Sequence, residues 1–363
     1  MEMFELGSDP SNVHEWDFEQ GVREFLQGWM DNSSGGYHYD TLTLTNYNTK
    51  LPRKSLLAGY STKRNDSSQR GKFGDGLTSG ICVLLREGMN ITIYNSDVIW
   101  KPVITYSGSF EHEVVAIEET INPNASDDYS VVIEGVSDSD MERIIDNTLF
   151  LQDDCEFFET SKGTILLEEK HKGKVFVGDL YIDNFDSEYG FDFLPECFEL
   201  DRDRKSLKPF DIQWTIKDLI AEMSSSELDD DLSDRVVSSM ESNDKSMQYV
   251  NAYSVSDSEN FKKSAEKLYN EKYGGMILTS DYSEAEELRE SGNKNVAYVN
   301  NSSFVTLVKS SESHQVVYGA RKEKETFSIE EMLDKFEDEW QHDMNVDMYE
   351  AWEKLSSEIK ERT

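Results

Sequence analysis

Cysteine is scarce in this sequence, which argues against a protein built on disulfides or cysteine-rich metal centres. Cys82, Cys155 and Cys197 are odd in number and far apart, so they form neither a C-x-x-C metal motif nor an obvious disulfide framework. Reduced thiols are the simpler interpretation. The six histidines show no metal spacing such as H-x-x-x-H, and no G-x-S-x-G elbow is present. The sequence therefore predicts neither a zinc site nor a hydrolase triad.

Long hydrophobic runs are missing as well. No apolar run approaches the ~20 residues that a membrane-spanning helix needs. Residues 1–5, MEMFE, lack the basic and apolar regions of a signal peptide. We therefore expect a soluble, cytoplasmic protein without membrane contact.

Basic residues are outnumbered by acidic ones. The chain has 36 lysines and arginines against 73 aspartates and glutamates, which gives a net charge of −37. This charge repels nucleic-acid phosphates and anionic lipids, so direct nucleic-acid binding is not expected. The acidic excess fits solubility in a salty medium, a basic protein partner, or mimicry of a phosphate backbone. At 363 residues, with 37% hydrophobic and 11% aromatic residues, the chain is long enough to fold into two or three domains.

The most distinctive stretch is RGKFGDGLTSG, residues 70–80. Gly71, Gly74 and Gly76 form a G-x-x-G-x-G pattern, and the apolar run ICVLL follows at 81–85. Glycine lets a ligand approach the main chain closely. At a helix N-terminus such a loop offers N–H groups and the positive end of the helix dipole to a phosphate. A surface loop is the alternative interpretation, and the neighbouring segments decide between the two.

A helix is predicted upstream, over residues 17–30. Its apolar stripe consists of Val22, Phe25, Leu26, Trp29 and Met30. Asp17 is the expected N-cap, with Gln20 three residues later completing a capping box.

The other flank of this helix carries Glu24, Gln27 or Gly28, and Asp31 one turn apart. A carboxylate held beside a phosphate site can act as a general base for water. The alternative is an ordinary solvated face.

A strand is predicted at 41–45, and it ends in the polar segment 46–49. Residues 55–66 then turn from apolar to hydroxyl-rich and basic. In this acidic chain, Lys63, Arg64, Arg70 and Lys72 gather beside the glycine stretch. Local positive charge of this kind is what a triphosphate requires.

Four segments follow one another along the chain: the helix segment REFLQGWMD, the strand with its polar turn, the Ser61-Thr62-Lys63 lid and the motif GKFGDG. In this order they resemble the Bergerat-fold ATPases. This superfamily, also called GHKL, includes DNA gyrase B, MutL repair proteins, sensor histidine kinases and the ninety-kilodalton heat-shock chaperones. The glycine motif is most similar to that of the chaperone branch, Gly-x-Phe-Gly-x-Gly-Phe. The resemblance covers roughly residues 15–222.

The resemblance implies ATP as ligand and Glu24 as the residue that positions the attacking water. It also implies a set of nucleotide-binding residues, namely Gln27, Gly28, Asp31, Asn46, Ser61, Thr62, Lys63, Gly71, Lys72, Phe73, Gly74, Asp75, Gly76 and Leu77. Two positions depart from the family. The magnesium-binding asparagine of its E-x-x-x-N helix is Gly28 here, and the adenine-binding aspartate of its D-x-G-x-G turn is Asn46. Magnesium thus has no identified ligand, although Asp31 or Asn32 could compensate, while Asn46 can still accept a hydrogen bond.

The run LDRDRKSL at 200–207 resembles the middle-domain loop of the chaperones, in which an arginine contacts the γ-phosphate. Matched residue by residue, that arginine falls on Arg204, with Arg202 as the fallback. A guanidinium offers a phosphate two parallel donors. A loop of internal Asp–Arg salt bridges is the alternative.

The fold predicted from these patterns is α+β. Strands at 90–94, 100–106, 114–118 and 130–135 and a helix at 138–150 predict a mixed sheet covered on one side by helices. Strands at 163–168 and 174–182 follow, and later helices and short strands alternate. The predicted parts are a Bergerat-type ATP-binding α/β sandwich at 1–150, a middle, transducer-like α/β domain at 151–222, an acidic linker or helix at 223–245, and an acidic α/β and helical region at 246–363.

Three functions remain open from the sequence. The leading hypothesis is a slow, chaperone-like ATPase that switches conformation, acts on a protein partner or client, and works as a homodimer. The second is a nucleotide sensor that binds ATP without hydrolysing it, which Gly28 favours. The third is an acidic interaction or inhibitor protein, such as a nucleic-acid mimic.

Overall fold

The computed structural model describes residues 1–32, 37–40, 42–61, 74–153, 155–198, 207–322, 332–333, 336–337, 344 and 346–360. The chain divides into two compact units, residues 1–226 with 244–250, and residues 227–243 with 251–363. Helices combine with antiparallel and mixed sheets, so the protein is α+β. Among the described residues, no helix has both the length and the apolar character needed to cross a membrane.

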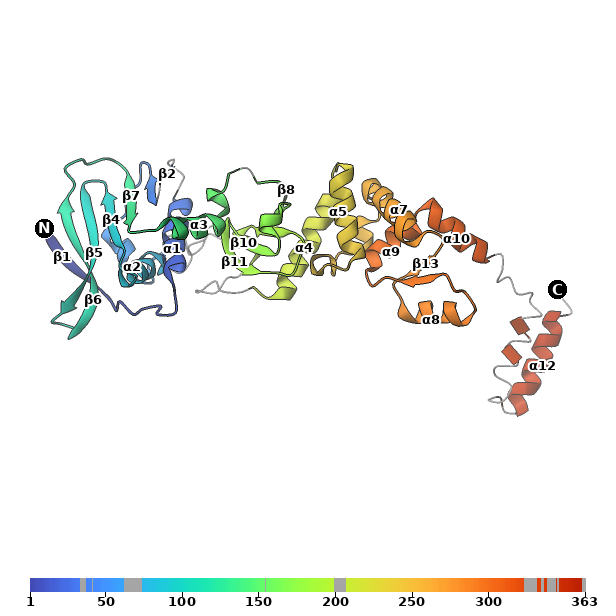
Figure 1. Cartoon of the computed structure of the whole chain (residues 1–363). Helices are drawn as coiled ribbons and strands as arrows, with labels where there is room; N and C mark the ends of the chain where they lie inside the picture. The colour runs from blue at the N-terminus through green and yellow to red at the C-terminus, as the bar shows by residue number, and fades with distance from the viewer. Residues whose placement is uncertain are drawn as a thin grey trace. The chain divides into compact units, whose positions relative to one another are not determined.

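The first unit begins with a seven-stranded sheet in the order β1-β6-β5-β4-β7-β3-β2 (Figure 1). Its strands are β1 (Glu2–Ser8), β2 (Tyr37–Asp40), β3 (Thr43–Asn46), β4 (Asn90–Asn95), β5 (Val98–Ser107), β6 (His112–Ile121) and β7 (Tyr129–Glu134). The predicted mixed sheet is wrong, because all neighbouring strands are antiparallel. Short links such as residues 96–97 form hairpins and are too short for the crossover that parallel strands need.

Two helices, α1 (Phe18–Asp31) and α2 (Gly76–Arg86), pack on the buried face of this sheet (Figure 1). The predicted capping box is confirmed, since the side chains of Asp17 and Gln20 each accept from the other's backbone N–H. Gly21 and Gly80 allow the two helices to approach closely. A Cβ on Gly21 would lie 2.9 Å from Val83, and one on Gly80 would lie 3.0 Å from the Gly21 carbonyl. This part of the chain also contains three short elements, namely η2 (Arg53–Leu56), α3 (Asp138–Asp146) and η3 (Leu149–Leu151).

The core of this part contains the predicted helix stripe. Val22, Phe25, Leu26, Trp29 and Met30 are buried together with side chains of α2 and of the sheet. Burying the stripe removes apolar surface from water, at roughly 25 cal/mol per Å². The 3.6-residue period was therefore a reliable signal for this helix.

A five-stranded mixed sheet follows, in the order β11-β10-β12-β9-β8, with β10 and β12 parallel. It consists of β8 (Phe157–Thr160), β9 (Gly163–Leu166), β10 (Lys174–Val177), β11 (Leu180–Asn184) and β12 (Gly190–Phe193). The elements around it are η4 (Glu169–His171), η5 (Pro195–Cys197), α4 (Pro209–Ser224) and η6 (Lys245–Met247). The single strand predicted at 174–182 is wrong. Gly178 and Asp179 adopt φ of 57° and 68° and turn the chain into a hairpin between β10 and β11.

The second unit alternates helices with a parallel pair of short strands. Its elements are α5 (Asp230–Glu241), α6 (Ala252–Val255), α7 (Glu259–Tyr273), β13 (Ile277–Thr279), α8 (Tyr282–Glu290), β14 (Val296–Tyr298), α9 (Ser302–Lys309), α10 (Glu312–Lys322) and α12 (Val346–Lys360). The predicted alternation of later helices and short strands is confirmed from α7 to α9. The acidic stretch 223–245 contains α5, which Asp229 caps by accepting from the N–H of Leu232.

Candidate functional site

A pocket of about 170 Å³ opens in the first unit, between α1, the start of α2 and the sheet. It brings together residues that lie far apart in the sequence. They are Trp16, Glu24, Phe25, Gln27, Gly28, Trp29, Asp31, Asn32, Leu44, Leu51, Ser55, Tyr60, Ser61, Gly74, Asp75, Gly76, Leu77, Tyr129 and Val131. The predicted flank of α1 thus faces the described part of the glycine stretch.

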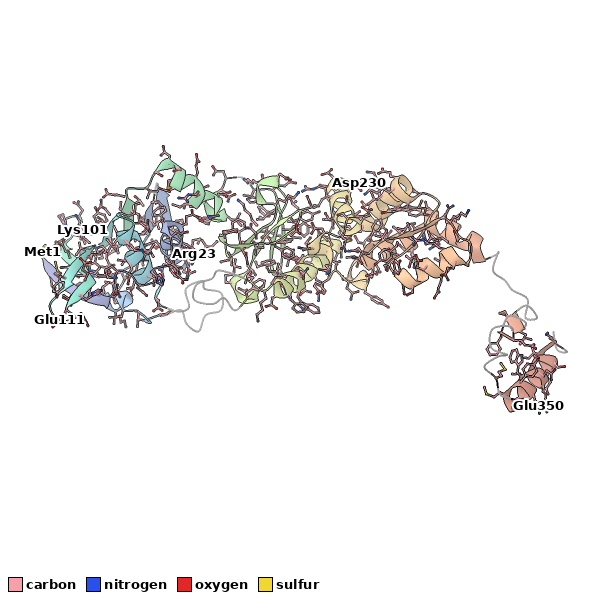
Figure 2. The ribbon with its side chains drawn as sticks, turned by 60° about the horizontal axis from the view of Figure 1, so that its bottom comes forward. Met1, Arg23, Lys101, Glu111, Asp230 and Glu350 are labelled. Atoms are coloured by element: carbon pink, nitrogen blue, oxygen red, sulfur yellow. The ribbon has the colours of Figure 1, made fainter. Side chains whose placement is uncertain are left out.

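Glu24 is the buried carboxylate of this pocket. Its side chain is 6% exposed, and one carboxylate oxygen, Oε1, lies 3.4 Å from Nη2 of Arg23. Arg23, labelled in Figure 2, also lies over the Trp16 ring, 5.6 Å from its centroid. Gln27, one turn further along α1, is 3% exposed. These polar side chains are therefore not part of a solvated helix face.

Gly76 makes room for Glu24. A Cβ added at Gly76 would lie under 3.0 Å from Oε2 of Glu24, closer than real Cβ atoms come to other atoms. The first residue of α2 must therefore be glycine if the carboxylate is to keep its place.

Gly74 is required for a different reason. Its φ is +80°, a conformation that side chains disfavour. A Cβ there would also lie 2.5 Å from the carbonyl of Tyr60. Gly74 thus lets the loop pass directly against the backbone of residues 60–61.

The N-terminus of α2 borders this pocket, and the side chain of its N-cap residue makes no capping hydrogen bond. Asp75 is the N-cap residue, but its carboxylate accepts from the N–H of Gly59 and does not cap α2. The first turn of α2 contains no acidic residue. The positive end of the helix dipole therefore borders the pocket, next to the Glu24 carboxylate.

The opposite side of the pocket is apolar. Leu44, Leu51, Tyr129 and Val131 line it. Burial raises the pKa of the Tyr129 phenol, so this group stays neutral. A flat, uncharged ring system suits such a wall.

Asn46 lies on β3, two residues after Leu44, and does not itself line the pocket. Its Nδ2 donates to the carbonyl oxygen of Trp29 at 2.8 Å, which sets the orientation of the amide. The side chain is fully buried, and Oδ1 has no hydrogen-bond partner within the described part of the chain. A buried acceptor without a partner is costly unless a ligand satisfies it.

Gly28 leaves a gap in the pocket wall. A Cβ there would meet nothing within 4 Å. The neighbouring Asn32 donates its Nδ2 to the Gly28 carbonyl at 2.7 Å, so part of this amide is already used by the helix end. Asp31 lines the same part of the pocket.

Other predicted site residues cannot be located. Thr62, Lys63, Gly71, Lys72, Phe73, Arg202 and Arg204 lie outside the described residues. The same holds for the basic residues Arg64 and Arg70.

The structure also reveals groupings that no motif indicated. A second cavity lies between α1, α3 and β11, lined by residues such as Asp17, Arg23, Asn147 and Tyr181. Separately, Cys155, Glu168 and His171 come together in the first unit. Their spacing matches no short metal motif, because the sheet and not a local turn brings them together.

No protein-family model matches the sequence. The chain is similar to an uncharacterized protein of Mycoplasma pneumoniae, with 21% identity over 187 residues. The match covers 47% of this chain and 76% of that protein.

Proposed function

We propose that the first unit binds ATP in this pocket, hydrolyses it slowly, and uses it to switch conformation toward a protein partner. The observation that carries the proposal is the buried Glu24 carboxylate beside the uncapped start of α2, where Gly76 has no side chain to displace it. In this proposal residues 1–150 are a Bergerat-type ATP-binding domain of the GHKL superfamily.

The phosphates bind at the start of α2 in this proposal. Gly74 and Gly76 leave the backbone bare there, and the helix dipole favours negative charge. Ser61 borders the same space. Gly71, Lys72 and Lys63 supply further N–H groups and positive charge, as the family resemblance implies.

The adenine lies against the apolar wall of Leu44, Tyr129 and Val131. The unpaired Oδ1 of Asn46 lies outside the pocket lining, so it accepts from the exocyclic amine through a water molecule. Without such a donor this buried oxygen costs about 1–3 kcal/mol.

In the hydrolytic step, Glu24 accepts a proton from a water molecule while the water oxygen forms a bond to the γ-phosphorus. The bond from that phosphorus to the β–γ bridging oxygen breaks, and ADP and phosphate leave. Arg23 lies beside Glu24 and helps to hold its carboxylate in place. The guanidinium of Arg204 contacts the γ-phosphate and stabilises its negative charge, as the resemblance implies.

The described residues fit magnesium poorly. Gly28 stands where the family has its metal-binding asparagine, and the Asn32 amide is already bonded to the Gly28 carbonyl. We therefore assign no step to the metal. This observation favours a second candidate, a sensor that binds ATP without turning it over.

Calorimetric titration of the full chain with a non-hydrolysable ATP analogue, with and without magnesium, tests the binding proposal. We expect one site per chain and a higher melting temperature, both lost in Gly74→Val. No binding in either condition would contradict the proposal. That result would favour the third hypothesis, an acidic interaction protein in which the fold is only a scaffold.

Phosphate release then separates the ATPase from the sensor. We expect Glu24→Gln to bind the analogue within a few-fold of wild type but to lose hydrolysis by about 10²–10⁴-fold, the usual contribution of a general base. Equal phosphate release from wild type and variant would leave the sensor as the function.

The switch and its partner follow from the same proposal. ATP would close residues 59–76 over the pocket and exclude water, and this closure would change how domains or two protomers pack. The net charge of −37 favours a protein with a basic surface over nucleic acid as the partner.

A further inference from the structure

Cys155, Glu168 and His171 form a compact group outside the ATP pocket. One ligand atom from each lies within 4.8 Å of the others. Cys155 precedes β8, while Glu168 and His171 lie at η4, between β9 and β10. The backbone bond from the N–H of Leu167 to the carbonyl of Glu156 extends the β8–β9 pairing and holds the two segments together.

Gln152 determines which nitrogen of His171 carries the proton. The Gln152 amide nitrogen donates to the carbonyl oxygens of Ile145, at 3.0 Å, and Asp146, at 3.3 Å, so its Oε1 must point the other way. That oxygen lies 2.8 Å from Nε2 of His171 and can only accept. Nε2 is therefore protonated. With the proton on Nε2, the Nδ1 of a neutral ring is a bare acceptor.

Within the described residues, Nδ1 of His171 lacks a hydrogen-bond partner even though the side chain is 0% exposed. The charged atom beside it is Oε2 of Glu168, 3.7 Å away, which is also an acceptor. Two facing acceptors repel each other unless a cation lies between them. Lys170 pairs with the same oxygen at 3.0 Å, but its side chain is 47% exposed and can turn to solvent.

Cys155 is the third residue of this group. Its Sγ lies 4.0 Å from Nε2 of His171. Around a tetrahedral zinc ion with bonds of about 2.0–2.3 Å, neighbouring ligand atoms are about 3.3–3.8 Å apart. One ligand atom of each residue lies within 4.8 Å of the others. To enclose an ion on Nδ1 the side chains must draw together, and Cys155 must turn from Nε2 toward Nδ1.

We propose that Cys155, Glu168 and His171 bind one zinc ion through Sγ, a carboxylate oxygen and Nδ1, with water in the fourth position. A thiolate and an imidazole suit zinc, whereas magnesium and calcium prefer oxygen ligands alone. On binding, the Cys155 thiol loses its proton to solvent and becomes the thiolate ligand. Gln152 is a positioning residue, since its carbonyl oxygen holds the Nε2–H and directs Nδ1 at the metal.

The bound ion ties the segment after η3 to η4, so it stabilises the folded first unit. This site is independent of the proposed ATP pocket, which has no residue in common with it.

The test is zinc titration of the metal-free full chain, without nucleotide, in competition with a chromophoric chelator. We expect one zinc per chain, a raised melting temperature, and a thiolate-to-metal charge-transfer band when cobalt replaces zinc. Cys155→Ala should abolish the band and weaken zinc binding at least 100-fold. Gln152→Ala should weaken binding by about 10–100-fold and keep the band, as expected for a group that orients a ligand.

Cys197→Ala is the matched control, because Cys197 is likewise a partly buried cysteine outside any disulfide but does not belong to the cluster. It should bind zinc like wild type. If Cys155→Ala fails to fold without metal, Glu168→Gln and Gln152→Ala decide the question. Absence of stoichiometric zinc binding by wild type, or unchanged binding in the cluster variants, overturns the proposal.

Discussion

The Glu24 carboxylate occupies the space that a side chain at Gly76 would need. Glycine suits position 76 because the Glu24 side chain on α1 fills the adjacent space. Gly74, two residues earlier, is glycine because of its own φ of +80° and its contact with the Tyr60 carbonyl. The two glycines of one motif thus have separate physical roles, and substitutions can tell them apart.

Gly76→Ala should weaken binding of the ATP analogue at least tenfold and destabilise the protein by less than about 1 kcal/mol. The added methyl group pushes the flexible end of the Glu24 side chain aside, so the carboxylate loses its place while the helices keep their packing. Calorimetry and urea unfolding measure the two effects. The control is Gly108→Ala, which lies outside the pocket, meets no described atom within 4 Å, and should leave both binding and stability unchanged. Normal binding by Gly76→Ala would show that Glu24 can move freely.

Gly28→Asn should increase magnesium-dependent phosphate release. The new amide enters open space on the pocket wall, at the position where the related ATPases carry their magnesium ligand. Single-turnover phosphate release with and without magnesium measures the gain, and Gly28→Ala should not show it. If Gly28→Asn binds the analogue but remains inactive in magnesium, the missing ligand is not what limits hydrolysis.

ATP should bind at least tenfold more tightly than inosine triphosphate, in which a carbonyl replaces the amine of the base. Oδ1 of Asn46 is buried and unpaired among the described residues, so a base with a carbonyl in place of the amine presents an acceptor where Oδ1 needs a donor. Competition titrations on the wild-type chain measure this preference without any mutation. Equal affinities would place the base away from Asn46.

Arg53→Leu should reduce stability at neutral pH and make unfolding less dependent on acid pH. Arg53 bonds the carboxylates of Glu2 and Glu119, and so joins η2 to strands β1 and β6. Hydrogen bonds from Arg53, with one from Trp100 at 2.7 Å, lower the pKa of Glu119.

A carboxylate whose pKa is lower in the folded protein stabilises the fold above its unfolded pKa of about 4.3. This contribution disappears as the pH falls through the lower, folded value. Urea midpoints of wild type and Arg53→Leu should therefore differ at pH 7 and converge toward acid pH. Lys50→Leu, which removes the exposed pair with Asp97, should change little at either pH. A constant difference across the range would assign the effect to packing of Arg53 on Phe4.

Local signals explain which elements could be predicted. The stripe of α1 and its capping box depend on residues within a few turns of each other, so both were predicted. Strand β1 was missed, because its alternation between Glu2 and Ser8 is weak and its pairing with β6 involves residues far along the chain. The hairpin at Gly178 and Asp179 was missed because the apolar runs on both sides were taken as one strand, although Gly-Asp between two such runs is itself a two-residue hairpin signal.

The sequence by itself determined the helical faces, the bare glycine backbone at residues 74–76 and the acidic charge, since these depend on residue type and short-range spacing. Only the tertiary structure decided that Glu24 lies against Gly76 and that the Asn46 amide turns toward Trp29. It likewise brought Cys155, Glu168 and His171 to one place. Distances of this kind depend on strand order and helix packing, which bring together residues that no local pattern connects.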